Sequence, residues 1–87
     1  MYALVFLTSA KKEFKKLDNV AQKRIKEKLT LLVENPELLK NNIKPLKGIH
    51  QGLFRLRINQ YRIVFQIKDD ELIITIVRVG HRKEVYE

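Results

Sequence analysis

The chain has 87 residues and a formal net charge of +8, from 18 Lys and Arg against 10 Asp and Glu, and it contains no Cys. This length holds one domain, so residues 1–87 are expected to fold as a single unit without a separate cofactor domain. The missing Cys excludes disulfide frameworks, cysteine zinc sites and thiol nucleophiles. The longest apolar stretch, around Leu72 to Val77, is far shorter than the ~20 residues of a membrane span. We therefore expect a cytoplasmic protein with no membrane partner.

The first half of the chain predicts a strand followed by two helices. Residues Tyr2 to Leu7 have the β-branched and aromatic content of a short strand, after which Thr8 or Ser9 offers a side-chain oxygen to cap a helix. Asp18 or Asn19 offers a cap for a second helix, which is expected to stop at Asn35 because a residue before proline avoids the helical region. The two apolar stripes, at helical spacing, are Ala10, Phe14 and Leu17, and then Ala21, Ile25, Leu29, Leu32 and Val33.

The second half of the chain predicts strands. The segment Ile43 to Gly48 is expected to lie at a sheet edge, because Pro45 cannot donate a hydrogen bond inside a sheet. Apolar and polar residues then alternate in three runs, which begin at Phe54, Tyr61 and Leu72 and are separated by two short polar breaks. The sequence thus predicts an α+β fold: an N-terminal strand, a helical hairpin, and an antiparallel β-meander packed on the helices.

Three arginines are expected to meet on one face of this sheet. If Asn59 and Gln60 form a two-residue turn, Arg57 pairs with Arg62, and Arg55 projects to the same side. Like charges directly opposite each other destabilise a sheet, and a purely structural sequence has no reason to place them so. An anion such as an RNA or DNA backbone would supply the missing counter-charge, since guanidinium groups bind phosphate oxygens in a bidentate way. An ordinary solvated basic face is the alternative.

The C-terminal stretch adds further polar groups. Gly80 permits a bend that would bring His81 and Arg82 toward the three arginines, and Tyr86 offers a ring on which a base could stack. The plainer alternatives are a solvated histidine and a tyrosine that packs against the protein.

Most of the excess positive charge lies in the first half of the chain, outside the candidate arginine site. It is interpreted either as a solvated helix surface or as a docking surface for nucleic-acid backbone. No nucleotide-binding glycine loop, metal-ligand set or paired carboxylates appear, so no metal or other cofactor is expected. The residues expected to contact RNA or the ribosome are Lys11, Lys12, Lys15, Lys16, Lys23, Arg24 and Lys47.

The order and spacing of several short motifs resemble the RelE branch of the RelE/ParE toxin superfamily. Each motif is weak alone, but together they cover nearly the whole chain and are most specific from Lys44 onward. They are Leu46-Lys47-Gly48, Leu53 to Ile58, Tyr61 to Phe65, Val79 to Arg82, and Val85-Tyr86.

This resemblance implies a toxin of a type II toxin–antitoxin pair that cleaves mRNA in the ribosomal A site without a metal. Its implied partners are the ribosome with its mRNA and a cognate antitoxin, for which an acidic, amphipathic segment would suit the basic surface. By resemblance, Arg62 stabilises charge on the scissile phosphate, Arg82 supports the leaving 5′ oxygen, and Tyr86 orients a base. The chemistry implied is attack of the RNA 2′-hydroxyl on the adjacent phosphate, assisted electrostatically.

One departure from the family pattern concerns proton transfer. The best-known member type carries lysines where this chain has Arg55 and Arg57, and arginine does not lose its proton under ordinary conditions. His81 is therefore the candidate acid or base in this sequence. The alternative function is a ParE-like inhibitor of DNA gyrase without nuclease activity, a branch that generally lacks this cluster of arginine, histidine and tyrosine.

Overall fold

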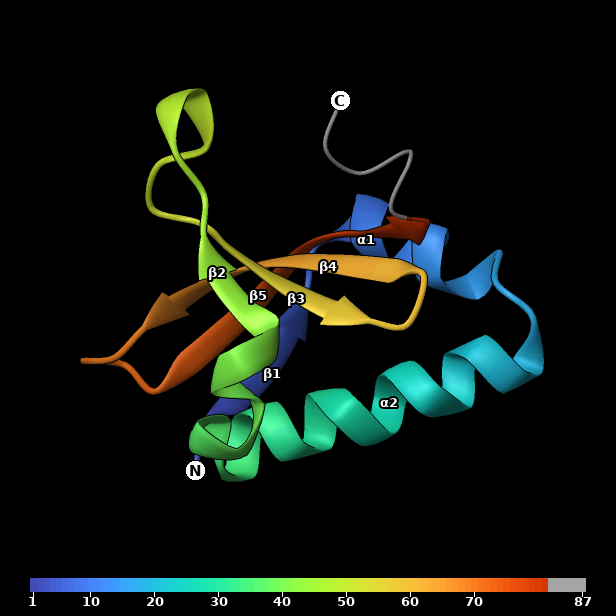
Figure 1. The fold of residues 1–87 in the computed structure, drawn as a ribbon, viewed down its shortest axis with the longest axis horizontal. Coiled ribbons are helices and arrows are strands. Elements are labelled where there is room, and N and C mark those ends of the chain that lie inside the picture. Colours follow the sequence, from blue (N-terminus) through green and yellow to red (C-terminus); the bar gives the residue numbers. More distant parts are fainter. Residues whose placement is uncertain (82–87) are drawn as a thin grey trace.

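The computed structural model describes residues 1–81, apart from the side chain of His50. Two helices, two short 3₁₀ helices and five strands make up this part of the chain (Figure 1). They are β1 (Ala3–Phe6), α1 (Thr8–Lys15), α2 (Asn19–Glu34), η1 (Pro36–Asn42), β2 (Ile43–Pro45), η2 (Gly48–His50), β3 (Phe54–Ile58), β4 (Tyr61–Lys68) and β5 (Ile73–His81).

The strands form one sheet in the order β1-β5-β4-β3-β2. Strands β2 to β5 are antiparallel neighbours, which confirms the predicted meander, and β2 lies at the edge as expected from Pro45. Strand β1 adds to the other edge in parallel with β5, so that Ala3 lies opposite Ile73. The predicted α+β fold is confirmed, and the parallel pairing of its first strand is a feature that the sequence pattern did not specify.

The helices of the described part of the chain cover one face of the sheet, and the face away from them is called here the open side. Figure 1 shows α2 running beneath the strands, while α1 packs against β5. Burying a large apolar side chain stabilises a fold by about 1.5–3 kcal/mol, so the shared core holds the two layers together. The largest fully buried side chains come from both layers and are Ile25, Leu29, Leu32, Leu56, Ile63, Phe65, Ile74, Ile76 and Val79.

The two helices begin in different ways. The predicted cap of α1 by Thr8 or Ser9 is wrong: Leu7 occupies the cap position, and no side chain caps this helix. Leu7 is held extended because its N–H donates to the Ile76 carbonyl (3.0 Å), and its own carbonyl accepts from Lys11 N–H (2.9 Å). The strand therefore runs directly into the helix, and Thr8 is already helical.

The predicted cap of α2 is confirmed for Asp18, whose carboxylate accepts a hydrogen bond from the Ala21 N–H at 2.8 Å. The helix ends at Glu34, directly before Asn35 and Pro36, as the proline rule predicts. No helix in the part of the chain described here is long and apolar enough to cross a membrane.

Tyr2, which directly precedes β1, is hydrogen-bonded to two other parts of the fold. The Tyr2 N–H donates to the Val33 carbonyl at the end of α2 (3.1 Å), and its hydroxyl donates to Asp69 in the β4–β5 turn (2.5 Å). The hydrogen bond to Asp69 raises the pKa of Tyr2 above its ordinary value.

Replacing Asp18 tests the cap of α2. We expect Asp18→Ala to lower the free energy of unfolding by about 1 kcal/mol, because an N–H of the first turn loses its acceptor. Urea unfolding followed by circular dichroism measures this change. Thr8→Ala is the matched control, expected to stay within about 0.5 kcal/mol because Thr8 caps nothing. Equal losses in the two variants would contradict the assignment of the caps.

Candidate active site

The turn between β3 and β4 sets the geometry of the candidate site. Asn59 and Gln60 form the predicted two-residue turn, with Asn59 in the left-handed region (φ 54°) that asparagine tolerates better than most residues. Ile58 lies opposite Tyr61, and Arg57 lies opposite Arg62. The predicted register of the two strands is therefore confirmed.

A line of cations runs across the open side of the sheet, which we call the basic face. Directly paired residues project to the same side, so the pairing across β2, β3, β4 and β5 assigns each member. Lys44 pairs with Arg55, Arg57 with Arg62, and Val64 with Arg78. The core residues Leu56 and Ile63 point to the opposite, helix-covered side. The basic face thus consists of Lys44, Arg55, Arg57, Arg62 and Arg78.

The arginines of the basic face differ in exposure. Arg55 and Arg62 are buried, with 9% and 8% of their surface exposed, whereas Arg57 is exposed. The Arg55 Nε atom is buried without a hydrogen-bond partner among the described residues, and such a group costs about 1–3 kcal/mol. An ordinary solvated face would leave these guanidinium groups in water. The burial of Arg55 favours the anion-site interpretation, because a bound phosphate would supply an acceptor and a counter-charge.

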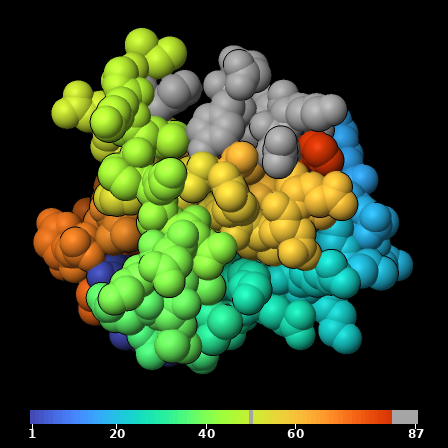
Figure 2. Space-filling model, in the orientation of Figure 1, coloured from blue at the N-terminus to red at the C-terminus, as the bar shows by residue number. Residues whose placement is uncertain are grey.

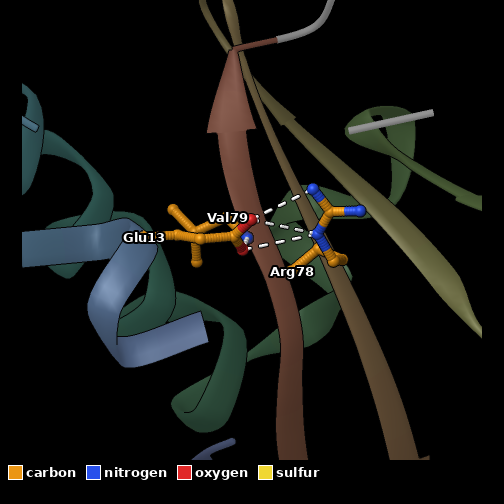
Figure 3. Close-up of polar contacts among 3 residues, drawn as sticks. All are labelled: Glu13, Arg78 and Val79. Carbon is orange, nitrogen blue, oxygen red and sulfur yellow. Dashed lines mark hydrogen bonds and ion pairs between the residues drawn. The ribbon is translucent and has the colours of Figure 1, made fainter. Parts of the chain in front are cut away.

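Arg78 has a carboxylate partner on α1, which Figure 3 shows. Its Nη2 lies 3.0 Å from Glu13 Oε2, and its Nε donates to the same oxygen at 3.1 Å. The Val79 N–H donates to Glu13 Oε1 at 2.9 Å. One carboxylate therefore neutralises the charge of Arg78 and satisfies a backbone donor of β5.

This contact lies where the sheet loses a strand. Strand β1 pairs with β5 only as far as Phe6 and Ile76, so the edge of β5 beyond that point has no neighbouring strand. Glu13 takes the place of the missing strand and fixes the end of β5 against α1. Sequence reasoning did not single out Glu13 or Arg78. The available signal was one acidic residue in an otherwise lysine-rich helix.

His81 ends β5, but the structure does not bring it to the arginines. Strand β5 continues through Gly80 without the expected bend, and His81 lies opposite Tyr61. The two rings meet edge to face, with centroids 6.0 Å apart. Tyr61 pairs with Ile58 on the helix-covered side, so this register assigns the imidazole to the side away from Arg62.

The cations expected to contact RNA or the ribosome lie mainly on the helices. All seven are exposed: Lys11, Lys12, Lys15, Lys16, Lys23, Arg24 and Lys47. Lys11 and Lys15 border a groove of about 590 Å³ between β1, α1 and α2, whose floor includes Phe6 and Phe14. The fold thus separates Lys11 and Lys15 from the basic face, whereas Arg24 lines a hollow that it shares with Arg57.

Comparison with known proteins identifies the family. Residues 4–86 match the family model described as the ParE toxin of the type II toxin–antitoxin system parDE. The mRNA interferase toxin RelE of Escherichia coli is 31% identical over 98% of this chain and 90% of its own. The structure of the isolated E. coli RelE toxin superposes with a TM-score of 0.76 at 30% identity, covering 99% of this chain and 92% of that one. The RelBE2 toxin–antitoxin complex of Mycobacterium tuberculosis gives 0.82 at 29% identity, covering 93% and 98%.

The chain belongs to the RelE branch of the RelE/ParE toxin superfamily. Two of the residues that the RelE resemblance singled out, Arg82 and Tyr86, lie outside the described part of the chain. The residues of this RelE-type toxin that the structure does bring together are therefore Arg55, Arg57 and Arg62. Within residues 1–81, no three His, Cys, Asp or Glu side chains gather as a metal site.

Substitutions of Glu13 test its role at the edge of β5. We expect Glu13→Ala to lower the free energy of unfolding by about 1–3 kcal/mol, because the partly buried Val79 N–H loses its acceptor. Glu13→Gln keeps an acceptor and is expected to lose less. Arg78→Ala removes only a half-exposed ion pair, worth about 0–1 kcal/mol. Urea unfolding orders the three variants, and a larger loss in Arg78→Ala than in Glu13→Ala would contradict this assignment.

Proposed function

We propose that this RelE-type toxin is a ribosome-dependent endoribonuclease that cleaves mRNA in the ribosomal A site. The observation that carries the proposal is the basic face, with the buried guanidinium groups of Arg55 and Arg62 on one side of the sheet. Sequence relatives from E. coli and Shigella flexneri are named mRNA interferases, which supports the same activity here. The proposed setting is the bacterial or archaeal cytoplasm.

The proposed reaction is an internal transesterification of RNA. The 2′-hydroxyl oxygen attacks the adjacent phosphorus, forms a new P–O bond and loses its proton, while the bond to the 5′ oxygen breaks and that oxygen gains a proton. Negative charge builds on the phosphate oxygens in the transition state. The guanidinium groups of Arg55 and Arg62 are held in place by the sheet, so they stabilise that charge without having to reorganise. In many enzymes such electrostatic stabilisation is the largest single contribution to the rate enhancement.

The remaining candidate residues have supporting roles in this proposal. Exposed Arg57 binds the RNA backbone beside the buried pair, as expected for a guanidinium fork. By family resemblance, Arg82 stabilises the leaving 5′ oxygen and Tyr86 stacks on a base. The five predicted docking lysines between Lys11 and Lys23 contact ribosomal RNA, so that this docking charge and the catalytic charge belong to different layers of the fold.

The proposed partner that silences the toxin is an antitoxin. Structures of related toxins include complexes of RelE with RelB from E. coli and from Methanococcus jannaschii. An acidic segment suits the toxin's surface, because its carboxylates would neutralise exposed cations such as Arg57. The antitoxin would then compete with RNA for the same charges.

Arg62→Ala tests the catalytic proposal. We expect mRNA cleavage to fall by about 100- to 1,000-fold, the usual effect of removing one group that stabilises developing charge, while ribosome and antitoxin binding persist. Primer extension on mRNA after induction in cells measures cleavage. Lys68→Ala is the matched control, since it removes a cation from the exposed end of the same strand. Full cleavage by Arg62→Ala would contradict the proposal, and intact mRNA with blocked replication for the wild type would support gyrase inhibition instead.

His81→Ala decides whether the imidazole transfers a proton. Because the register directs His81 toward Tyr61 and away from Arg62, we expect the cleavage rate and its dependence on pH to stay unchanged. Single-turnover cleavage of ribosome-bound mRNA between pH 5 and 8, where an ordinary histidine titrates, makes the measurement. If His81→Ala cleaves more slowly and its rate no longer changes with pH on the acidic or the basic side of the profile, His81 acts as the acid or the base.

A further inference from the structure

A second basic site lies beside the basic face, in a hollow of about 450 Å³ between α2, η1 and the end of β3. Figure 2 shows these three elements meeting on the face turned toward the viewer, α2 in teal, η1 in green and β3 in yellow. The volume falls in the range of about 300–1,000 Å³ that is usual for small-ligand sites. Its lining residues are Arg24, Glu27, Lys28, Leu39, Asn42, Arg57, Ile58 and Asn59.

The charge of the hollow is unbalanced. Arg24 and Lys28 from α2 face the same space as Arg57 from β3, against the single carboxylate of Glu27. None of the ion pairs among the described residues involves any of these four side chains. Three cations drawn together from two elements repel one another, and a bound anion removes that repulsion. Two of the three are arginines, which suit phosphate oxygens.

The other half of the lining suits a base. Asn42 and Asn59 carry exposed amides, and each amide has donors and an acceptor that match the edge of a nucleobase. Leu39 and Ile58 complete the lining, and both are buried, with 5% and 3% of their surface exposed. The hollow therefore combines cations for a phosphate with amides for the edge of a base.

Arg57 connects the hollow to the basic face. It belongs to the basic face through its pairing with Arg62, and its exposed side chain also lines the hollow. An RNA strand bound at Arg62 can thus continue past Arg57 to Arg24 and Lys28. An acidic protein segment would use the cations equally well, but the continuity of the hollow with the basic face through Arg57 suits the RNA proposed to bind there. The observations favour RNA.

We propose that this hollow binds one nucleotide of single-stranded RNA next to the one at the basic face. The inference deepens the proposed function and rests on it, because the RNA bound here is the substrate of that reaction. The phosphate contacts Arg24, Lys28 and Arg57, and the base contacts Asn42 and Asn59. The site makes no bond and breaks none. It positions the substrate strand and contributes selectivity for the base.

The test uses the full-length toxin and labelled single-stranded oligouridylate and oligoadenylate, without ribosomes, with binding measured by fluorescence anisotropy over a range of salt concentrations. We expect Lys28→Ala to weaken both RNAs and to reduce the slope of log K against log salt by about 0.7, the value for one phosphate contact. Lys68→Ala is the control, since Lys68 ends β4, lies outside the hollow and is not among the residues expected to contact RNA, and it is expected to leave the slope unchanged.

Asn42→Ala tests the base contact separately. We expect it to keep the salt slope and to weaken one of the two RNAs by about two- to tenfold more than the other, as expected for loss of a hydrogen bond to a base. In the wild-type toxin, the Asn42 side-chain amide signals should shift in NMR spectra when RNA is added. That measurement needs no variant and holds even where a substitution impairs folding.

Three results would overturn the inference. The first is an equal salt slope for Lys28→Ala and Lys68→Ala, and the second is an Asn42 amide whose signals RNA does not shift. The third is an acidic polyglutamate peptide whose binding Lys28→Ala and Asn42→Ala weaken while RNA binding stays unchanged, since this would make the hollow a protein-docking site. Cleavage on ribosomes by the wild type is scored separately, so failure of the nucleotide site is distinguishable from failure of the nuclease function.

Discussion

The two-residue turn at Asn59 and Gln60 is the constraint on which the rest of the site depends. Side chains alternate along a strand with a period of two, so a slip of one residue would exchange the two faces of β3 and β4. Arg62 would then point into the core, and Ile63 would point into water. Neither exchange is tolerable, because a buried unpaired guanidinium and an exposed core residue both cost free energy. The hydrophobic core therefore enforces the register that gathers the cations.

Gathering cations in this way has an energetic cost that the described part of the protein offsets at only some positions. Glu13 neutralises the charge of Arg78 and accepts a hydrogen bond from the Val79 N–H at the edge of β5. Arg78 therefore stabilises the fold and is less available to bind an anion. Exposed Arg57 forms no ion pair with the other described residues. The charge of Arg78 is thus balanced where α1 meets β5, whereas the exposed charge of Arg57 lies on the basic face, where a phosphodiester would supply the balance.

The layered architecture divides the positive charge into groups with different surroundings. The helix lysines are exposed and solvated, whereas Arg55 and Arg62 lie buried in the opposite layer. Charge–phosphate attraction is stronger where water is excluded, so the buried arginines suit a reacting phosphate and the lysines suit a diffuse RNA surface. The net charge of the chain alone carries none of this distinction, because it counts both kinds of cation equally.

The sequence by itself determined the order of the main strands and helices, a cap for α2 at Asp18 or Asn19, the end of α2 before Pro36, and, given a two-residue turn, the pairing of Arg57 with Arg62. These depend on local preferences and on periodicity, which are read from neighbouring residues. The tertiary structure alone decided that Leu7 occupies the cap position of α1, that Glu13 accepts a hydrogen bond from β5, and that the His81 ring meets the Tyr61 ring. Each of these follows from contacts between segments far apart in the chain: Leu7 with Ile76, Glu13 with Val79, and His81 with Tyr61 across the sheet. No local pattern encodes such contacts, because they exist only once the sheet has closed and the helices have packed against it.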